Sequence, residues 1–572
     1  MTYDSMRKAT FALALLLTTT GCADLLVENP NDPDRERALA SPADVQSLLQ
    51  GATTGAISQI ADLWAVHTAA FADQTTSTNN FLSFWAFTDE PRRRYNNRTT
   101  NPDLTISGSP WGAFNTTVSS ANTVLTLIET DGSEIVIEGV DETLKTQASA
   151  YFARGLARGY LGMMYDKAYL VEIDTDLTSL ETVPYSDMIA GAVSDLERAK
   201  EIAAQAPGFT WDFLPGTNSY SLAEFNEICN AFAARFLISE PRTRAEAAAF
   251  GNDRWSQIIT YAQNGVGTAT PAFSPASVAG QFFLNYADWN TFFIAGAGYL
   301  PVDLKQIHLL DPSYPVEYPA SGVLPAAKSS DPRIAYYAYT EEFGFLNASR
   351  RRSIFSNYYH LRMFADNDWA GRSGDPIPML TRSEMQYIIA EANFWLGNKA
   401  GTAAALANSP FGTVATELEY PLPSVGLGYF DDFDSNAGYA AGKTLSATAS
   451  DAQIVRALHT EYAVELDLMG GTGLQWYFMR RHDLLQAGTP LHYPIPGTEL
   501  EVTQAEYYTF GGVEFASEEG TADGSNTWKT FDQRNGGAPT AAPAGGQLVV
   551  DGSYGPFKGQ LRTAPTGRKP NR

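Results

Sequence analysis

The residues that could perform catalysis are sparse, and they follow none of the spacings that catalysis or metal binding usually requires. The six histidines stand at positions 67, 308, 360, 459, 482 and 492, too scattered for a multi-histidine metal site. The chain contains no His-Glu-x-x-His, no Cys-x-x-Cys and no Gly-x-Ser-x-Gly sequence, so the usual signatures of zinc peptidases, thiol redox proteins and α/β-hydrolases are missing. We therefore expect no catalytic residue, no metal site and no cofactor.

Carboxylates need separate consideration, because a glycosidase requires only two of them at the correct separation. Two groups of acidic residues are candidates: Glu461, Glu465 and Asp467, and Asp73, Asp89 and Glu90. The first group lies on one helical stretch and is followed by Arg480 and Arg481, which favours an ion-pair network between helices. The second group lies in an aromatic loop region, and its spacing neither indicates nor excludes a catalytic pair.

Aromatic residues are more informative, at 12% of the chain. Most of them belong in the core. Two groups fall outside helical periodicity: Phe81, Phe84, Trp85 and Phe87, with Arg92, Arg93, Arg94, Tyr95 and Asn96 after them, and Phe282, Phe283, Tyr286, Trp289 and Phe292. Flat rings beside Asn and Arg donors suit the apolar faces and hydroxyl rims of sugars, and they also suit peptides. For each ring, packing in the core is the alternative.

The charge of the chain excludes a broad class of partners. The formal net charge is −25, which offers no electrostatic footprint for nucleic acid. The two basic runs, 92–94 and 350–352, are local exceptions. We interpret both as solvated or ion-paired loops rather than phosphate sites.

The N-terminal residues predict an exported lipoprotein. Arg7 and Lys8 precede an apolar run, Phe11 to Leu17, that is too short to span a bilayer and is typical of a signal peptide. Thr19-Thr20-Gly21-Cys22 resembles the bacterial sequence at which the cysteine becomes acylated, so we expect lipidation of Cys22. A secretory signal with an incidental cysteine is the alternative. The other cysteine, Cys229, lies in an apolar helical stretch and is expected to be a buried, inert thiol.

The best-specified element that could position these residues is a helix from Thr381 to Leu396. Thr381 and Glu384 have the spacing of a capping box, apolar residues recur at helical spacing, and Gly397 predicts a left-handed C-cap. A short helix from Ala400 to Leu406 follows. Such a pair cannot bury its apolar stripe alone, so it must stack on similar neighbours.

Comparable helical patterns recur along the chain, at 42–60, 111–128, 148–163, 185–199, 221–240, 255–265, 450–469 and 474–485. Gly155 and Gly159 would permit close approach of one of these helices to its neighbours. Helix pairs at irregular spacing predict a mainly α fold, a tetratricopeptide-like solenoid with long loop-rich insertions.

The same patterns divide the chain into segments. We expect a signal peptide at 1–21, a lipidated tether at 22–40, a helical domain at 41–505 and a low-complexity, mobile tail at 506–572. Irregular insertions are expected within the domain, at about 71–110, 268–375 and 409–449. Long irregular segments often carry function.

Several motifs carry a family resemblance that covers roughly Cys22 to Leu500. The most specific are Glu461-Tyr462, Glu465-Leu466, Met469-Gly470, Arg480-Arg481-His482-Asp483-Leu484 and Pro494-Ile495-Pro496, with support from Trp111 to Ile128, Asp331-Pro332-Arg333 and Arg382 to Gly397. Together they resemble the SusD/RagB family of outer-membrane nutrient-uptake lipoproteins. Tyr462, Met469 and Gln486 replace the Arg, Glu and Arg of the family pattern, so we expect altered local ion pairing and an unchanged fold.

The resemblance implies a SusD-like fold and a non-enzymatic lipoprotein, lipid-anchored in the outer membrane and exposed at the cell surface. Such proteins cap a TonB-dependent, SusC-like transporter and hold oligosaccharide or peptide near its mouth. In glycan-binding members the ligand rests on an aromatic platform, for which Trp85, Tyr95, Asn96 and Trp289 are the candidates by position. Two other functions stay open: a membrane-anchored glycoside hydrolase, and a protein-binding helical-repeat scaffold.

Overall fold

A computed structural model describes residues 39, 41–60, 63–77, 83–101, 105–214, 219–267, 272–273, 300–329, 331–339, 351–360, 379–413, 443–467, 469–470, 473–516 and 518–534. The chain divides into two compact units, Met1–Leu48 and Leu49–Arg572. The first unit is described only at residues 39 and 41–48, where the Ser41 hydroxyl accepts a hydrogen bond from the Asp44 amide at 3.2 Å and caps the first helix. The expected signal peptide and Cys22 lie outside the described residues.

Helices dominate the described part of the chain. They are α3 (Pro42–Ile60), α4 (Leu63–Phe71), α5 (Phe84–Thr88), α6 (Thr105–Leu125), α7 (Thr143–Met164), α8 (Tyr185–Ala203), α9 (Leu222–Ile238), α10 (Arg244–Ala249), α11 (Asn252–Gln263), α13 (Leu304–Leu310), α14 (Arg382–Trp395), α15 (Lys399–Ala407), α16 (Pro410–Thr413), α17 (Asp451–Thr460), α18 (Leu474–Arg481), α19 (Gly497–Val502) and α20 (Trp528–Arg534).

The strands are short and pair only in antiparallel twos among the described residues. The pairs are β1 (Val136–Ile137) with β2 (Val140–Asp141), β3 (Lys167–Tyr169) with β4 (Thr182–Pro184), β5 (Thr210–Trp211) with β6 (Tyr220–Ser221), β7 (Ala272–Phe273) with β10 (Leu380–Thr381), and β8 (Tyr337–Tyr339) with β9 (Tyr358–His360).

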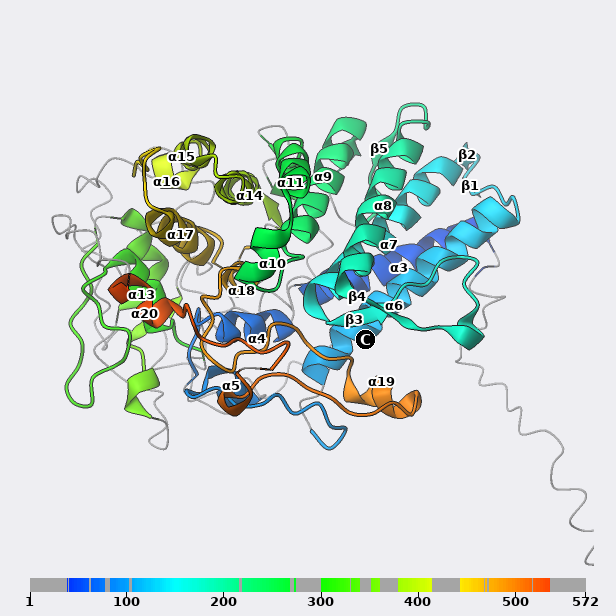
Figure 1. Cartoon of the computed structure of the whole chain (residues 1–572). Coiled ribbons are helices and arrows are strands. Elements are labelled where there is room, and N and C mark those ends of the chain that lie inside the picture. The colour runs from blue at the N-terminus through cyan, green and yellow to red at the C-terminus, as the bar shows by residue number, and fades with distance from the viewer. Residues whose placement is uncertain are drawn as a thin grey trace, which may run out of the picture. The chain divides into compact units, whose positions relative to one another are not determined.

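Helices α6, α7, α8, α9, α11, α14 and α15 pack each against the next, in chain order, and Figure 1 shows this succession. Small residues allow the close packing. A Cβ atom on Gly155 of α7 would lie 3.0 Å from the Ala192 carbonyl oxygen of α8, and one on Gly159 would overlap the Phe236 ring of α9. The predicted mainly α fold of stacked helix pairs is confirmed.

The predicted helix starts are largely confirmed. Complete capping boxes begin α9, at Ser221 and Glu224, and α17, at Ser450 and Gln453. The α14 box is only half formed: the Thr381 hydroxyl accepts from the Glu384 amide at 3.1 Å, but the Glu384 carboxylate is occupied by the buried Arg235 guanidinium. Gly397 has φ of +72°, which confirms the left-handed turn after α14.

One predicted helix start was wrong because tertiary contacts override local preference. Helix α6 begins at Thr105 and contains Pro110, although this stretch reads as a loop. Its first turns are held by long-range contacts, since the Tyr165 hydroxyl donates to the Ser107 carbonyl. The helix predicted at 450–469 is largely confirmed, since α17 continues as a π-helical turn, Glu461–Glu465.

Part of the segment expected to be a mobile tail is ordered. The structure places 506–516 and 518–534 against the helical body: Arg94 forms an antiparallel bridge with Gly511, and Trp528 at the start of α20 is 4% exposed. The Gly- and Ser-rich composition misled the prediction because the backbone and side-chain contacts of this segment are with residues distant in sequence, which composition does not reveal. Residues 535–572 lie outside the described residues.

Candidate ligand-binding site

The first aromatic segment forms the short helix α5, and its rings divide between core and surface. Phe84 and Phe87, three residues apart, share one face and are buried. The Phe87 ring centroid lies 4.9 Å from that of Phe71 and 4.3 Å from that of His67. Trp85, on another face of the helix, is half-buried. Trp85 is thus a partly accessible residue on a helix that the core holds in place.

Tyr95 does not lie where a ligand platform needs it. Its side chain is 6% exposed, its hydroxyl is hydrogen-bonded to Ser107 Oγ at 2.7 Å, and its ring packs edge-on against Tyr493 with 5.6 Å between centroids. A platform ring must have at least one face open to solvent. We therefore remove Tyr95 from the ligand candidates. Buried and exposed side chains alternate along this loop, so position in the sequence alone did not show that Tyr95 is buried.

Asn96 is exposed and lies in a tight polar loop. Its Oδ1 accepts from the Arg98 amide at 3.2 Å, and its carbonyl accepts from Asn101 Nδ2 at 2.7 Å. The adjacent Asn97, which the sequence did not single out, is buried and donates to the carbonyls of Ile495 at 2.9 Å and Tyr508 at 3.0 Å. Asn97 thus anchors the loop on which Asn96 is presented. Trp289 lies outside the described residues, as does Cys22.

A buried ion pair fixes the start of this loop. The Arg92 guanidinium pairs with the Asp73 carboxylate and donates to the Phe87 carbonyl at 2.8 Å. Burial alone would raise the pKa of Asp73, but the charges of Arg92 and Lys305 outweigh it and hold this pKa below its usual value. Arg92 is therefore an ion-paired core residue, as the sequence interpretation allowed.

Gln486, where the family pattern has Arg, belongs to the same cluster. Its Nε2 donates to both Asp73 carboxylate oxygens at 3.0 Å and to Glu90 Oε1 at 2.7 Å. A neutral amide can satisfy both carboxylates without adding another positive charge beside Arg92. Gln486 thus contacts these carboxylates through amide hydrogen bonds rather than through an ion pair.

The acidic group Asp73, Asp89 and Glu90 is engaged in ion pairs. Besides the Asp73 pair, Asp89 lies 2.6 Å from Arg93, and Glu90 pairs with Lys529. A structural role accounts for these three carboxylates.

Glu461 and Glu465, on the π-helical turn after α17, form the predicted ion-pair network but with a different partner, while Asp467 lies 3.0 Å from His360. Both Glu461 oxygens accept from Arg333 at 2.7 Å, and Arg333 also lies 2.9 Å from Asp331. Glu461 is 0% and Glu465 2% exposed. The Asp331-Pro332-Arg333 motif supplies the cation that we had assigned to Arg480 and Arg481.

Those two arginines have other partners. Arg481 pairs with Glu391 on α14 at 2.6 Å. Arg480 donates to the carbonyls of Met163 at 3.1 Å, Leu491 at 2.8 Å and Ser239 at 2.6 Å. Backbone carbonyls of three segments thus take the place of a carboxylate, an arrangement that sequence spacing cannot reveal.

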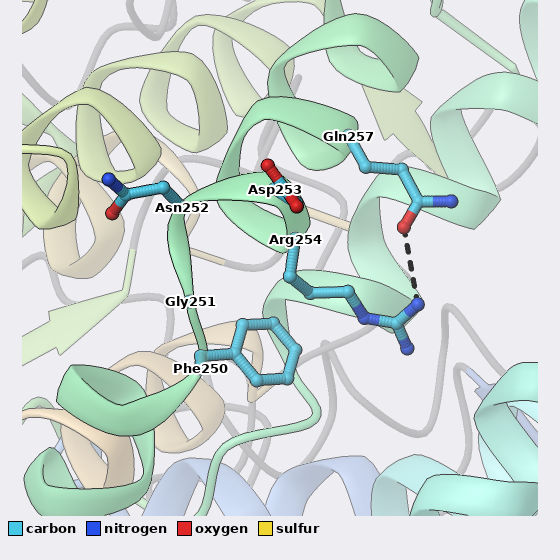
Figure 2. Close-up of a pocket in the computed structure, with 6 residues that line it drawn as sticks. All are labelled: Phe250, Gly251, Asn252, Asp253, Arg254 and Gln257. Atoms are coloured by element: carbon cyan, nitrogen blue, oxygen red, sulfur yellow. Dashed lines mark hydrogen bonds between the residues drawn. The ribbon is translucent and has the colours of Figure 1, made fainter.

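A hollow of about 730 Å³ lies at the start of α11, lined by Phe250, Gly251, Asn252, Asp253, Arg254 and Gln257 (Figure 2). The Arg254 guanidinium, the principal cation there, donates to Gln257 Oε1 at 3.2 Å and Glu240 Oε2 at 2.7 Å. Both terminal nitrogens of the guanidinium are therefore engaged within the protein. No residue of the aromatic segment lines this hollow, and we assign it no ligand.

Within the described ranges, no group of three or more His, Cys, Asp or Glu side chains is arranged to hold a metal ion. No helix in the described part of the chain combines the length and apolar character that a membrane span requires. Cys229 is buried and free, and burial raises the pKa of its thiol, as expected for an inert cysteine.

Comparison with known proteins gives a likeness in fold alone. No family model matches the sequence, and no curated protein matches it. A SusD/RagB family protein from Bacteroides thetaiotaomicron VPI-5482 superposes with a TM-score of 0.53 at 10% identity, over 86% of this chain and 99% of that chain. A SusD homolog from Parabacteroides distasonis ATCC 8503 gives a TM-score of 0.51 at 11% identity, over 80% of this chain and 93% of that one. The chain therefore has the fold of the SusD/RagB family, with a sequence far removed from those of these two proteins.

Proposed function

We propose that this protein is a non-catalytic outer-membrane lipoprotein that captures oligosaccharide or peptide and delivers it to a TonB-dependent transporter. The observation that carries the proposal is the SusD-like fold, since the comparison with a SusD/RagB family protein covers 86% of this chain. The signal-like N-terminus ending in Cys22 supports a lipid anchor, and the sequence motifs shared with the SusD/RagB family support the same assignment.

In this proposal the ligand contacts Trp85 and Asn96, with Trp289 as a further candidate. An exposed indole face stacks on the C–H face of a sugar ring, and an asparagine amide can donate to and accept from its hydroxyls. Trp85 is suited to this because α5 is backed by Phe84 and Phe87 in the core. A rigid support reduces the entropy lost on binding.

A binding screen tests the capture function. The soluble chain from residue 23 onward is titrated with panels of linear oligosaccharides and peptides, and the mixtures are analysed for products. We expect binding of at least one class without cleavage. Trp85→Ala should weaken that binding about tenfold, roughly the contribution of one stacked ring. Trp395→Ala, which removes another half-buried tryptophan, on α14, serves as the matched control. Release of shortened oligosaccharide would instead indicate a glycosidase, and no binding at all would contradict the proposal.

The anchor and the partner are tested in cells. Metabolic labelling with a palmitate analogue should modify the wild-type chain and not the Cys22→Ala variant. Detergent extraction with a tag on this chain should recover a TonB-dependent transporter. Recovery of other proteins without the transporter, combined with no ligand in the screen, would favour a scaffold function.

A further inference from the structure

The C-terminal strap, residues 505–516 and 518–534, pairs directly with the loop that presents Asn96. The Tyr95 amide donates to the Phe510 carbonyl at 3.1 Å, and the Val513 amide donates to the Arg92 carbonyl at 3.1 Å. The Thr509 hydroxyl donates to the Tyr95 carbonyl at 2.6 Å. The strap therefore lies along this loop much as an added strand would.

The other side of the strap is fastened to the segment that follows α18. The Gly488 amide donates to the Ala522 carbonyl at 2.8 Å, and the Leu491 amide to the Gly520 carbonyl at 2.9 Å. A Cβ atom on Gly488 would collide with the Val513 backbone, so glycine is required for this close approach. The strap thus joins the loop at 92–97 to a buried part of the helical body.

Two side chains of the strap reach the segment that contains α5. The Trp528 indole nitrogen donates to Asp73 Oδ2 at 2.7 Å, and the Lys529 ammonium group pairs with Glu90. Asp73 lies two residues after α4, and Glu90 lies two residues after α5. The strap therefore ties down both ends of the segment that carries Trp85.

We propose that the strap is a positioning element that holds this segment and loop in the shape that presents Trp85 and Asn96 to ligand, with Trp528 and Lys529 as its positioning residues. The part that concerns ligand rests on the proposed function. An ordered loop loses less conformational entropy when ligand binds, so the strap contributes to affinity without touching the ligand. The strap follows the last sequence motif of the family resemblance, Pro494-Ile495-Pro496.

Hydrogen–deuterium exchange of the full-length protein in detergent tests the hold on the loop. Trp528→Phe removes the bond to Asp73 and keeps a ring in place, and Lys529→Met removes the charge opposite Glu90. Each should accelerate exchange at 92–97 about tenfold. Trp211→Phe removes an equivalent buried indole bond, to Ser149 Oγ at 3.2 Å, and Lys145→Met an equivalent lysine pair, with Glu142 at 2.6 Å. Both controls should leave the loop unchanged.

The outcomes separate this proposal from the proposed function. Unchanged exchange at 92–97 in both strap variants, or acceleration spread evenly over the chain including α14, would overturn the hold on the loop. Titration with an oligosaccharide or peptide that binds the wild type should show at least fivefold weaker binding in both strap variants, and equal affinity would overturn the contribution to ligand presentation. If the wild type binds no oligosaccharide or peptide of the panels, the proposed function and the ligand part of this proposal are both wrong. The exchange measurement would then still show whether the strap holds the loop at 92–97 in place.

Discussion

At the scale of single residues, the buried charges determine how the irregular segments attach to the helices. The sequence predicted an ion-pair network around Glu461 and Glu465, and the network exists. It did not reveal the partner, because Arg333 stands 128 residues away from Glu461 and periodicity carries no information over such a separation. The only sequence signal for Arg333 was the short Asp331-Pro332-Arg333 motif. This motif is part of the family resemblance, but the resemblance gave it no role.

Removing the Arg333 guanidinium, which Glu461 and Asp331 share, should destabilise the fold strongly. Arg333→Met leaves Glu461 buried without its cation and leaves Asp331 with Lys443 alone, and we expect a loss of about 3–5 kcal/mol in the free energy of unfolding. Arg198→Ala, which breaks an exposed pair with Glu201 at 3.0 Å, should change it by less than about 0.5 kcal/mol. Urea denaturation followed by circular dichroism measures both, and similar midpoints for the two variants would contradict the structural role of the network.

A second buried pair predicts a dependence on pH. Burial opposes ionisation of Glu391, but Arg481 and His482 outweigh it and lower the pKa of Glu391 from 4.5 to about 2. A lowered pKa in the folded state stabilises the protein above pH 4.5, and this contribution is lost as pH falls toward 2. It amounts to about 3 kcal/mol at neutral pH.

Glu391→Gln should therefore be less stable than the wild type at pH 7, and the difference should shrink between pH 4.5 and pH 2. The midpoints of urea denaturation of both proteins, measured at pH 7, 5, 4 and 3, test this prediction. A difference that stays constant over this range would show that the carboxylate is not held ionised by its partners.

At the scale of elements, the sequence located helices well where caps and apolar stripes agreed, as in α9, α14 and α17. It failed where backbone contacts rather than side-chain patterns hold a segment. Helix α5 was hidden in an apparent loop, since five residues are too few to display a helical period. The strap was hidden because its contacts join residues far apart in the sequence, such as Thr509 and Tyr95, which stand 414 positions apart.

Helix α5 allows a sharp comparison between neighbouring residues. Phe87→Ala empties a fully packed site and should cost about 3–5 kcal/mol in the free energy of unfolding. Trp85→Ala should cost less than half as much, because the Trp85 ring is only half-buried, and should act mainly on ligand affinity. Thermal denaturation of both variants checks this, and equal destabilisation would mean that Trp85 is a core residue.

The close packing of α7 gives another prediction. Gly159→Ala should destabilise the protein by about 1–3 kcal/mol, because its Cβ would overlap the Phe236 ring. Gly112→Ala on α6 meets no atom within 4 Å and should be neutral or stabilise by up to about 1 kcal/mol. Chemical denaturation distinguishes the two, and a neutral Gly159→Ala would imply that α7 and α9 pack less closely than described.

At the scale of the whole molecule, amphipathic helix pairs were enough to predict the mainly α fold, and a few motifs were enough to predict its SusD-like form. The ligand site could not be predicted to the same degree. Along 95–97, buried and exposed side chains alternate, so Tyr95 and Asn96 have opposite environments although they are adjacent. Such loops follow contacts with distant segments, here 495–511, and a single sequence does not display those contacts.

The most direct test of the account is a calorimetric titration of the purified chain and its Trp85→Ala variant with oligosaccharide and peptide panels, with product analysis of each mixture. The account predicts saturable binding of one ligand class by the wild type, about tenfold weaker binding by the variant, and intact ligand recovered from both. Absence of binding across both panels, or recovery of cleaved ligand, would contradict it.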